Sequence, residues 1–270
     1  MNEHLVTVLQ AFQNTPTAEL EVIISRKVMQ GKQNGTLPFE MWKKLYRWVK
    51  TGCKQNPIHM IFEGEQTFMD CFYDNNIRVR ARFGQDPVCI IKTKIASIHA
   101  KCPQRKFLDF HFTLKNEVPT TEPPIGQQPL YVRIQKVYSF RYKNAFQYAF
   151  KKVATGATRE LACQETPTYE LELEVLRDSH YFQTKTIEHI ADSFIEKTLD
   201  LTGRGENEEL TLELSILPKS LKLVEAKIKG PTRKYISKKK LLAMGADVNI
   251  QKPPKKPKKE PKQKKKILVE

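Results

Sequence analysis

Residues 169–175 read Tyr-Glu-Leu-Glu-Leu-Glu-Val, with carboxylates and apolar side chains in strict alternation. In a β-strand successive side chains point to opposite faces, so Glu170, Glu172 and Glu174 would form one acidic row, spaced by roughly 6.5–7 Å. The apolar row behind them has to pack on a core. The acidic row must therefore face either water or an enclosed polar cavity.

A second strand of this kind lies near the start of the chain, where Ala18-Glu19-Leu20-Glu21-Val22 repeats the alternation. The chain as a whole is basic, with a net charge of +16 and a pI near 9.5. Residues 251–270 contain nine lysines and two glutamates, so the rest of the chain is basic as well. This charge favours a polyanionic partner such as nucleic acid over an acidic membrane. Two acidic strands in a basic chain are most simply explained by a bound divalent metal, because Mg²⁺ and Mn²⁺ prefer carboxylate oxygens.

Short runs typical of β-strands, separated by turn-rich breaks, fill most of the region up to about residue 176. Their spacing, without interleaved helices, predicts a mainly β fold built on an antiparallel sheet or barrel. The expected strands are 18–26, 57–62, 67–73, 76–83, 88–98, 106–115, 129–142, 145–154 and 168–176, with another at 209–216. Amphipathic patterns predict flanking helices at 3–13, 38–50, 184–200 and 218–229. We expect residues 1–230 to form one folded domain, followed by a basic Lys/Pro-rich tail over 231–270 that cannot bury enough apolar surface to order itself.

Several predicted strands carry cations at alternate positions, including Arg78, Arg80 and Arg82, and then Lys92 and Lys94. Such rows could be solvated faces, just as the acidic rows could be the exposed side of an ordinary sheet. If instead both kinds of row face one cavity, that cavity suits an anion together with a hard cation. Carboxylates, a metal ion and cations together describe a phosphoryl hydrolase that uses metal-assisted attack by water.

Cysteine usage and the absence of apolar spans favour an intracellular protein. The five cysteines are scattered, without metal-ligand spacing, which is typical of reduced thiols. Neither a secretory signal nor a run of 18 apolar residues is visible, so we expect no membrane partner.

Two segments between the acidic strands make a family resemblance specific. Phe112-Thr113-Leu114-Lys115-Asn116-Glu117-Val118-Pro119 resembles a strand that ends in Glu-x-Pro, and Val132-Arg133-Ile134 through Ser139-Phe140-Arg141 resembles a basic strand with its turn. With the two acidic strands, they are similar to the triphosphate tunnel metalloenzymes over roughly residues 15–180. The most similar branch is the metal-dependent RNA 5′-triphosphatases of fungal, protozoal and large-DNA-virus mRNA capping systems.

The resemblance implies an eight-stranded antiparallel β-barrel with a hydrophilic tunnel, which removes the γ-phosphate from 5′-triphosphate RNA in the first step of capping. Carried over to this chain, Glu19, Glu21, Glu172 and Glu174 would hold Mg²⁺ or Mn²⁺, with support from Glu170. Glu117 would orient the attacking water. Arg80, Arg133 and Arg141 would hold phosphates.

The chain departs from the family pattern after Arg133. Gln135 and Val137 stand where Lys and Arg are common, so either Lys136 serves through a local bulge or the tunnel uses other cations. The strand expected at 145–154 contains no acidic residue over 146–153, although one is common there.

Two alternatives remain open from the sequence. The same tunnel could act on inorganic triphosphate or nucleoside triphosphates, or an inert barrel could serve as an RNA-binding or assembly subunit. The sequence has no Lys-x-Asp-Gly nucleotidyl-transfer motif. A guanylyltransferase or other capping subunit is therefore an expected partner.

Overall fold

A computed structural model describes residues 3–26, 35–82, 84–121, 126–203, 208–216 and 218–228 of the chain. All of them lie within one compact unit, Met1–Pro231. The predicted basic tail, 231–270, lies outside the described residues.

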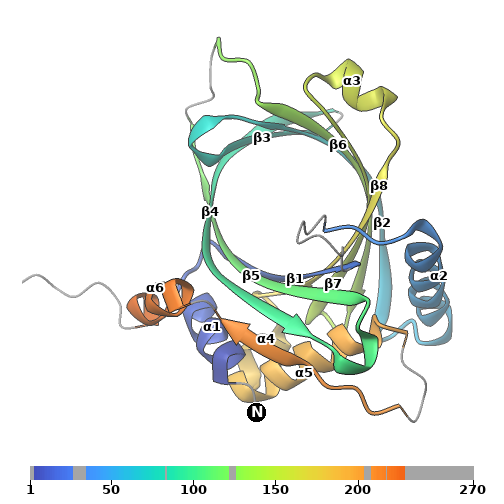
Figure 1. The fold of residues 1–270 in the computed structure, drawn as a ribbon, viewed down its shortest axis with the longest axis vertical. Coiled ribbons are helices and arrows are strands. Elements are labelled where there is room, and N and C mark those ends of the chain that lie inside the picture. The colour runs from blue at the N-terminus through green and yellow to red at the C-terminus, as the bar shows by residue number, and fades with distance from the viewer. Residues whose placement is uncertain are drawn as a thin grey trace, which may run out of the picture. The chain divides into compact units, whose positions relative to one another are not determined.

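Eight antiparallel strands form a closed ring, which Figure 1 shows in a view through its opening. The strands follow one another in the order β3-β2-β6-β7-β8-β1-β5-β4, and β4 pairs with β3 to close the ring. Their bounds are β1 Ala18–Arg26, β2 Met60–Phe72, β3 Ile77–Arg82, β4 Gln85–Lys101, β5 Leu108–Pro119, β6 Tyr131–Tyr142, β7 Phe146–Gly156 and β8 Thr168–Val175. A short strand, β9 (Glu213–Ile216), pairs with the last residues of β4 outside this closure. The predicted mainly β fold is confirmed.

The two strands predicted at 57–62 and 67–73 are one continuous strand, β2. Its pairing with β6 shifts register between Phe62 and Gly64. Gly64 has a φ of 120°, a conformation that side chains disfavour. In the sequence alone this irregularity looks like a break between strands, so nine strands are expected up to residue 176 where the ring has eight.

Helices cover the outside of part of the ring. They are α1 (Glu3–Gln13), α2 (Phe39–Gln55), α3 (Arg159–Gln164), α4 (His180–Thr184), α5 (Ile187–Asp200) and α6 (Pro218–Ile228), with short 3₁₀ turns at Asp74–Asn76 and Pro103–Arg105. The helix predicted at 184–200 is α5, with α4 as a separate turn before it, and α3 was not predicted. None of the described helices is both long and apolar enough to cross a membrane. The five cysteines all lie in the described ranges, and none of them forms a disulfide.

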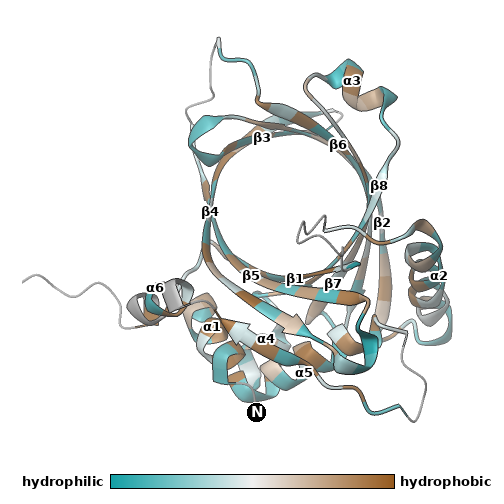
Figure 2. Ribbon diagram, viewed as in Figure 1, coloured by the Kyte–Doolittle hydropathy of each residue, from teal (hydrophilic) through white to brown (hydrophobic). Residues whose placement is uncertain are grey.

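The core lies between the outer face of the ring and these helices. Leu20, Val22 and Ile24 of β1 are fully buried, as are Leu171 and Leu173 of β8. They belong to one cluster with the apolar residues of α1 and α5. Hydrophilic and apolar residues alternate along the ring strands in Figure 2. Because the apolar rows face outward onto the helices, the acidic rows of β1 and β8 face the lumen of the ring.

Helix α2 fixes the outer side of β8 through one aromatic residue. Trp42 is almost fully buried, and its indole N–H donates a hydrogen bond of 3.1 Å to the backbone carbonyl of Glu170. The ring of Trp42 also packs edge-on against Phe150 of β7, at 5.7 Å between centroids. This packing holds the outer face of β7 and β8, so that the opposite side chains project into the lumen.

Candidate active site

The acidic rows of β1 and β8 lie side by side in the lumen. The two strands are paired antiparallel, with Glu21 opposite Glu174 and Ile23 opposite Glu172. Glu19, Glu21, Glu172 and Glu174 line one cavity of about 180 Å³. The structure thus brings together all four glutamates that the resemblance assigned to the metal.

Burial and mutual repulsion shift the protonation of these carboxyls. Burial, with repulsion from Glu19, Glu21 and Glu172, raises the pKa of Glu174 to about 8. Burial also raises the pKa of Glu19 to about 7, even though the ammonium group of Lys92 opposes it. At Glu19 and Glu174, therefore, the nearby lysines do not offset the combined effect of burial and of the neighbouring carboxylates on the pKa.

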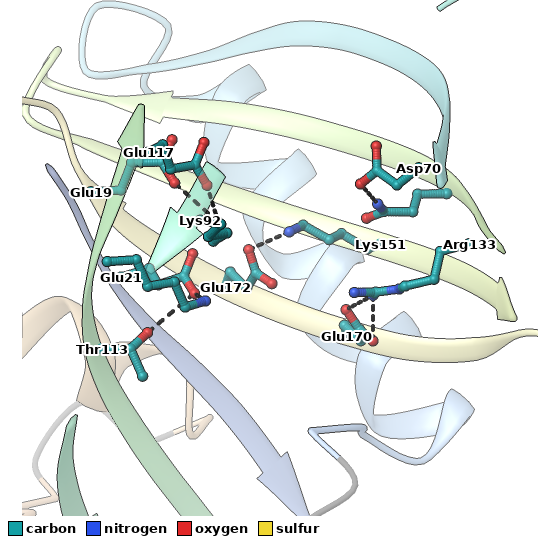
Figure 3. Close-up of polar contacts among 12 residues, drawn as sticks. Glu19, Glu21, Asp70, Lys92, Thr113, Glu117, Arg133, Lys151, Glu170 and Glu172 are labelled. Atoms are coloured by element: carbon teal, nitrogen blue, oxygen red, sulfur yellow. Dashed lines mark hydrogen bonds and ion pairs between the residues drawn. The ribbon is translucent and has the colours of Figure 1, made fainter. Parts of the chain in front are cut away.

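Lysines from neighbouring strands pair with the glutamates. Lys115 of β5 pairs with Glu21, and Lys151 of β7 pairs with Glu172. Figure 3 shows Lys151 of β7 reaching Glu172 on the neighbouring strand β8. Burial would raise the pKa of Glu21, but Lys115, Lys92 and Lys151 lower it to about 2.

A hard divalent cation fits this donor set. All the donors are carboxylate oxygens, which such ions prefer, and the four glutamates line one cavity. Among the described residues, no group of three or more His, Cys, Asp or Glu is already arranged to hold a metal ion. The lysine pairs explain this arrangement, because three of the four carboxylates, those of Glu19, Glu21 and Glu172, are directed to ammonium groups.

Glu170 and Glu117 have their own basic partners. Arg133 Nη2 donates to both carboxylate oxygens of Glu170, at 2.9 and 2.8 Å. Glu117 accepts from Arg78 at 3.1 Å and from Lys92, and it lines the same cavity as Glu19 and Glu174. Burial would raise the pKa of Glu117, but Lys92 and Arg78 lower it. Glu117 is therefore a charged acceptor beside the glutamate cluster.

A second cavity, of about 330 Å³, continues from Glu21 and Glu172 into a cationic half of the lumen. Its lining has seven cations against three acids. The cations are Arg78, Arg80, Lys92, Lys94, Lys115, Arg133 and Lys151, and the acids are Glu21, Asp70 and Glu172. Clustered cations of this kind suit phosphate oxygens.

Arg80 is held in this half by Asp70, through two hydrogen bonds of 2.7 Å. Asp70 is fully buried and also accepts from Gln135, at 2.5 Å. Burial opposes charge on Arg80, but the carboxylate of Asp70 raises its pKa. Gln135, which departs from the family pattern, thus helps to fix the pair that orients Arg80.

The position of Lys136 corrects the expectation that it reaches the lumen through a bulge. The register of β6 with β7 is continuous through this residue. Lys136 pairs with Glu65 at 2.5 Å, and its ammonium group lies 5.8 Å from the Tyr138 ring, on the outer side where Tyr138 meets Trp42. Arg141 lies at the other end of β6, pairs with Glu63, and lines a large cavity that also contains Glu19, Glu117 and Glu174.

Sequence reasoning missed Lys151, Lys115 and Asp70 as site residues. Lys115 stands two residues before Glu117, so alternation along that strand places both on one face. Asp70 is a single acid between apolar residues of a strand, a pattern that signals a buried, paired carboxylate. Lys151 and Lys152 are adjacent, and only the pairing of β7 with β8 decides which of them enters the lumen.

Comparisons with known proteins agree with this geometry. Residues 16–198 match the family model described as mRNA capping enzyme, beta chain. A sequence search among curated proteins found no significant match.

Three similar solved structures share the fold. The Pct1 RNA triphosphatase of S. pombe is 14% identical, with a TM-score of 0.59, covering 74% of this chain and 92% of that chain. Its complex with the Spt5 CTD is 15% identical, with a TM-score of 0.52 and coverage of 74% and 86%. The Mimivirus capping enzyme triphosphatase is 12% identical, with a TM-score of 0.51 and coverage of 75% and 99%.

Proposed function

This chain belongs to the mRNA capping enzyme beta-chain family, the RNA triphosphatases of the capping pathway, and we propose how its lumen removes the γ-phosphate from 5′-triphosphate RNA. The observation that carries the proposal is the convergence of the β1 and β8 glutamates beside a cationic cavity. In this reaction water attacks the γ-phosphorus in line, and the bond from that phosphorus to the bridging oxygen breaks. The products are inorganic phosphate and an RNA with a 5′-diphosphate.

Glu19, Glu21, Glu172 and Glu174 are the residues that would hold Mg²⁺ or Mn²⁺. When bound, such an ion supplies charge neutralisation and polarisation at the γ-phosphate. Glu170, fixed by Arg133, would support the row from its neighbouring position on β8.

The lumenal cations would bind the triphosphate. Lys115 and Lys151 now pair with Glu21 and Glu172, and they can turn to phosphate oxygens once those carboxylates hold a metal. Arg80 and Arg133 are already oriented by Asp70 and Glu170, so their guanidinium groups lose little freedom on binding phosphate. Arg141, which lines a cavity with Glu19, Glu117 and Glu174, has the most exposed side chain of the three predicted arginines.

Glu117 is the proposed water-orienting residue. Its pKa is held low by Lys92 and Arg78, which keeps the carboxylate ionised and able to accept a hydrogen bond from water. It lines the cavity that holds Glu19, Glu21 and Glu174, within the space that the γ-phosphate would occupy.

Phosphate release from 5′-triphosphate RNA, ATP and inorganic triphosphate, each with Mg²⁺ or Mn²⁺, tests this function. We expect release from the RNA, and a loss of at least roughly 10²-fold in kcat for Glu172→Gln. Glu65→Gln is the matched control, because Glu65 pairs with Lys136 on the outer side of the ring. Hydrolysis of free triphosphate alone would assign a different substrate, and no release from any of the three would support an inert barrel.

Partners and location follow from the same proposal. A separate guanylyltransferase or other capping subunit would use the diphosphate end, inside the cell, where mRNA is capped. We further propose that residues 231–270, with their lysines, form a tail separate from the domain at 1–230 that contacts RNA phosphates without reading sequence.

A further inference from the structure

Two aromatic rings stack at the rim of the cationic cavity. Phe72 and Tyr131 are direct partners across the pairing of β2 with β6. Their ring centroids are 4.5 Å apart and their planes differ by 13°. Each stands two residues from a side chain in the lumen, Asp70 on β2 and Arg133 on β6, so both rings belong to the lumenal face.

The rings lie at the cationic end of the lumen. Phe72 lines the cavity that also contains Glu21, Glu172 and the seven cations. Tyr131 is the first residue of β6 and lies one side-chain repeat, about 6.5–7 Å, beyond Arg133. It is 38% exposed. Glu19, Glu117 and Glu174 line the other cavity, away from these rings.

This order of charges sets a direction for the substrate, if the proposed function holds. A γ-phosphate beside the glutamates places the α- and β-phosphates among the cations that extend towards Arg133. The nucleoside that carries the α-phosphate then lies at the rim, where Phe72 and Tyr131 expose an aromatic surface. Base stacking on aromatic side chains tolerates any base, because every base has a π-face.

We propose that Phe72 and Tyr131 form a stacking platform for the base of the 5′-terminal nucleotide. The platform favours RNA ends, and nucleotides in general, over inorganic triphosphate, which has the same phosphates and no base. This inference rests on the proposed function, since it requires the triphosphate to occupy the lumen.

The test compares kcat/KM for 5′-triphosphate RNA with kcat/KM for inorganic triphosphate in each variant. Tyr131→Ala and Phe72→Ala should each lower the ratio of RNA to inorganic triphosphate about tenfold, which corresponds to about 1.4 kcal/mol. Tyr131→Phe keeps the ring and should keep the ratio. Phe62→Ala is the matched control: Phe62 pairs with Phe140 across the same two strands, at 5.0 Å, and is 42% exposed on the opposite face.

A spectroscopic measurement separates stacking from a purely structural role. RNA with 2-aminopurine as its first base and a non-hydrolysable β,γ-imido triphosphate end should lose fluorescence on binding the wild type and Tyr131→Phe. The loss should be smaller with Tyr131→Ala. If Tyr131→Ala misfolds, Tyr131→Leu fills the rim without a π-face and should behave in the same way.

An unchanged ratio in the folded variants, or equal quenching with and without the Tyr131 ring, would overturn the platform. The proposed function would stand in that case, because the wild type would still release phosphate from RNA. Absence of release from every triphosphate would instead remove the proposed function, and the platform with it.

Discussion

Glu21 of β1 lies directly opposite Glu174 of β8, yet their carboxyl groups have pKa values shifted in opposite directions. Three lysines lower the pKa of Glu21 to about 2 against the effect of its burial. Burial and three neighbouring glutamates raise the pKa of Glu174 to about 8. At neutral pH one carboxyl of this pair is ionised and its partner holds a proton. An added cation between them would release that proton, which couples metal binding to pH.

Stability without metal should fall as the pH rises from about 4.5 to 8. A carboxyl whose pKa is raised from 4.5 to about 8 by folding binds its proton more tightly in the folded state than in the unfolded state. Its contribution to stability is therefore lost as the pH rises through that window, and Glu19, with a pKa of about 7, acts in the same direction. Urea unfolding in EDTA between pH 5 and 8 measures this slope. Glu174→Gln should flatten it, and identical slopes in the two proteins would contradict the raised pKa.

Lys151→Met should lower kcat/KM for 5′-triphosphate RNA by roughly 10²-fold, because it removes a cation that faces the lumen beside Glu172. The adjacent Lys152 faces outward, with its ammonium group 5.8 Å from the Trp42 ring. Lys152→Met is thus the control and should change kcat/KM less than twofold. Steady-state phosphate release measures both variants. Equal losses of kcat/KM in the two variants would contradict the register of β7 that directs Lys151, and not Lys152, into the lumen.

Asp70→Asn should destabilise the fold by roughly 2–3 kcal/mol, because it leaves the Arg80 guanidinium without its buried counter-charge. This magnitude is below the usual range for a buried pair, since the Arg80 side chain is 33% exposed. Glu63→Gln breaks the more exposed pair with Arg141 and should cost less than about 1 kcal/mol. Chemical unfolding at pH 7 gives both values. A cost for Asp70→Asn no greater than that for Glu63→Gln would contradict the structural role of Asp70.

The glutamate rows could be predicted from the sequence because alternation in a strand depends only on the strand itself. Glu19 and Glu21 share one face of their strand, as do Glu172 and Glu174, whichever strands they pair with. The pairing of β1 with β8, which brings the two rows together, joins strands far apart in the sequence. Alternation within a strand does not predict it, and only the family resemblance does.

The cations could not be assigned in the same way. Whether Lys151 or Lys152 enters the lumen depends on a register between strands, and a shift of one residue exchanges the two faces. A lumenal Lys136 would need a bulge in β6, whereas the register shift in this pair of strands lies between Phe62 and Gly64 of β2. Arg80 depends on Asp70, a contact that short-range pattern does not reveal.

The position of a bound metal tests the central claim most directly. Crystals soaked with Mn²⁺, and measured for anomalous scattering, should show one peak inside the ring, at about 2.0–2.2 Å from carboxylate oxygens contributed by both β1 and β8. Glu19, Glu21, Glu172 and Glu174 are the expected ligands, with Lys115 and Lys151 turned away from them. A peak outside the ring, or one held by a single strand, would contradict the claim that the two acidic strands share an ion.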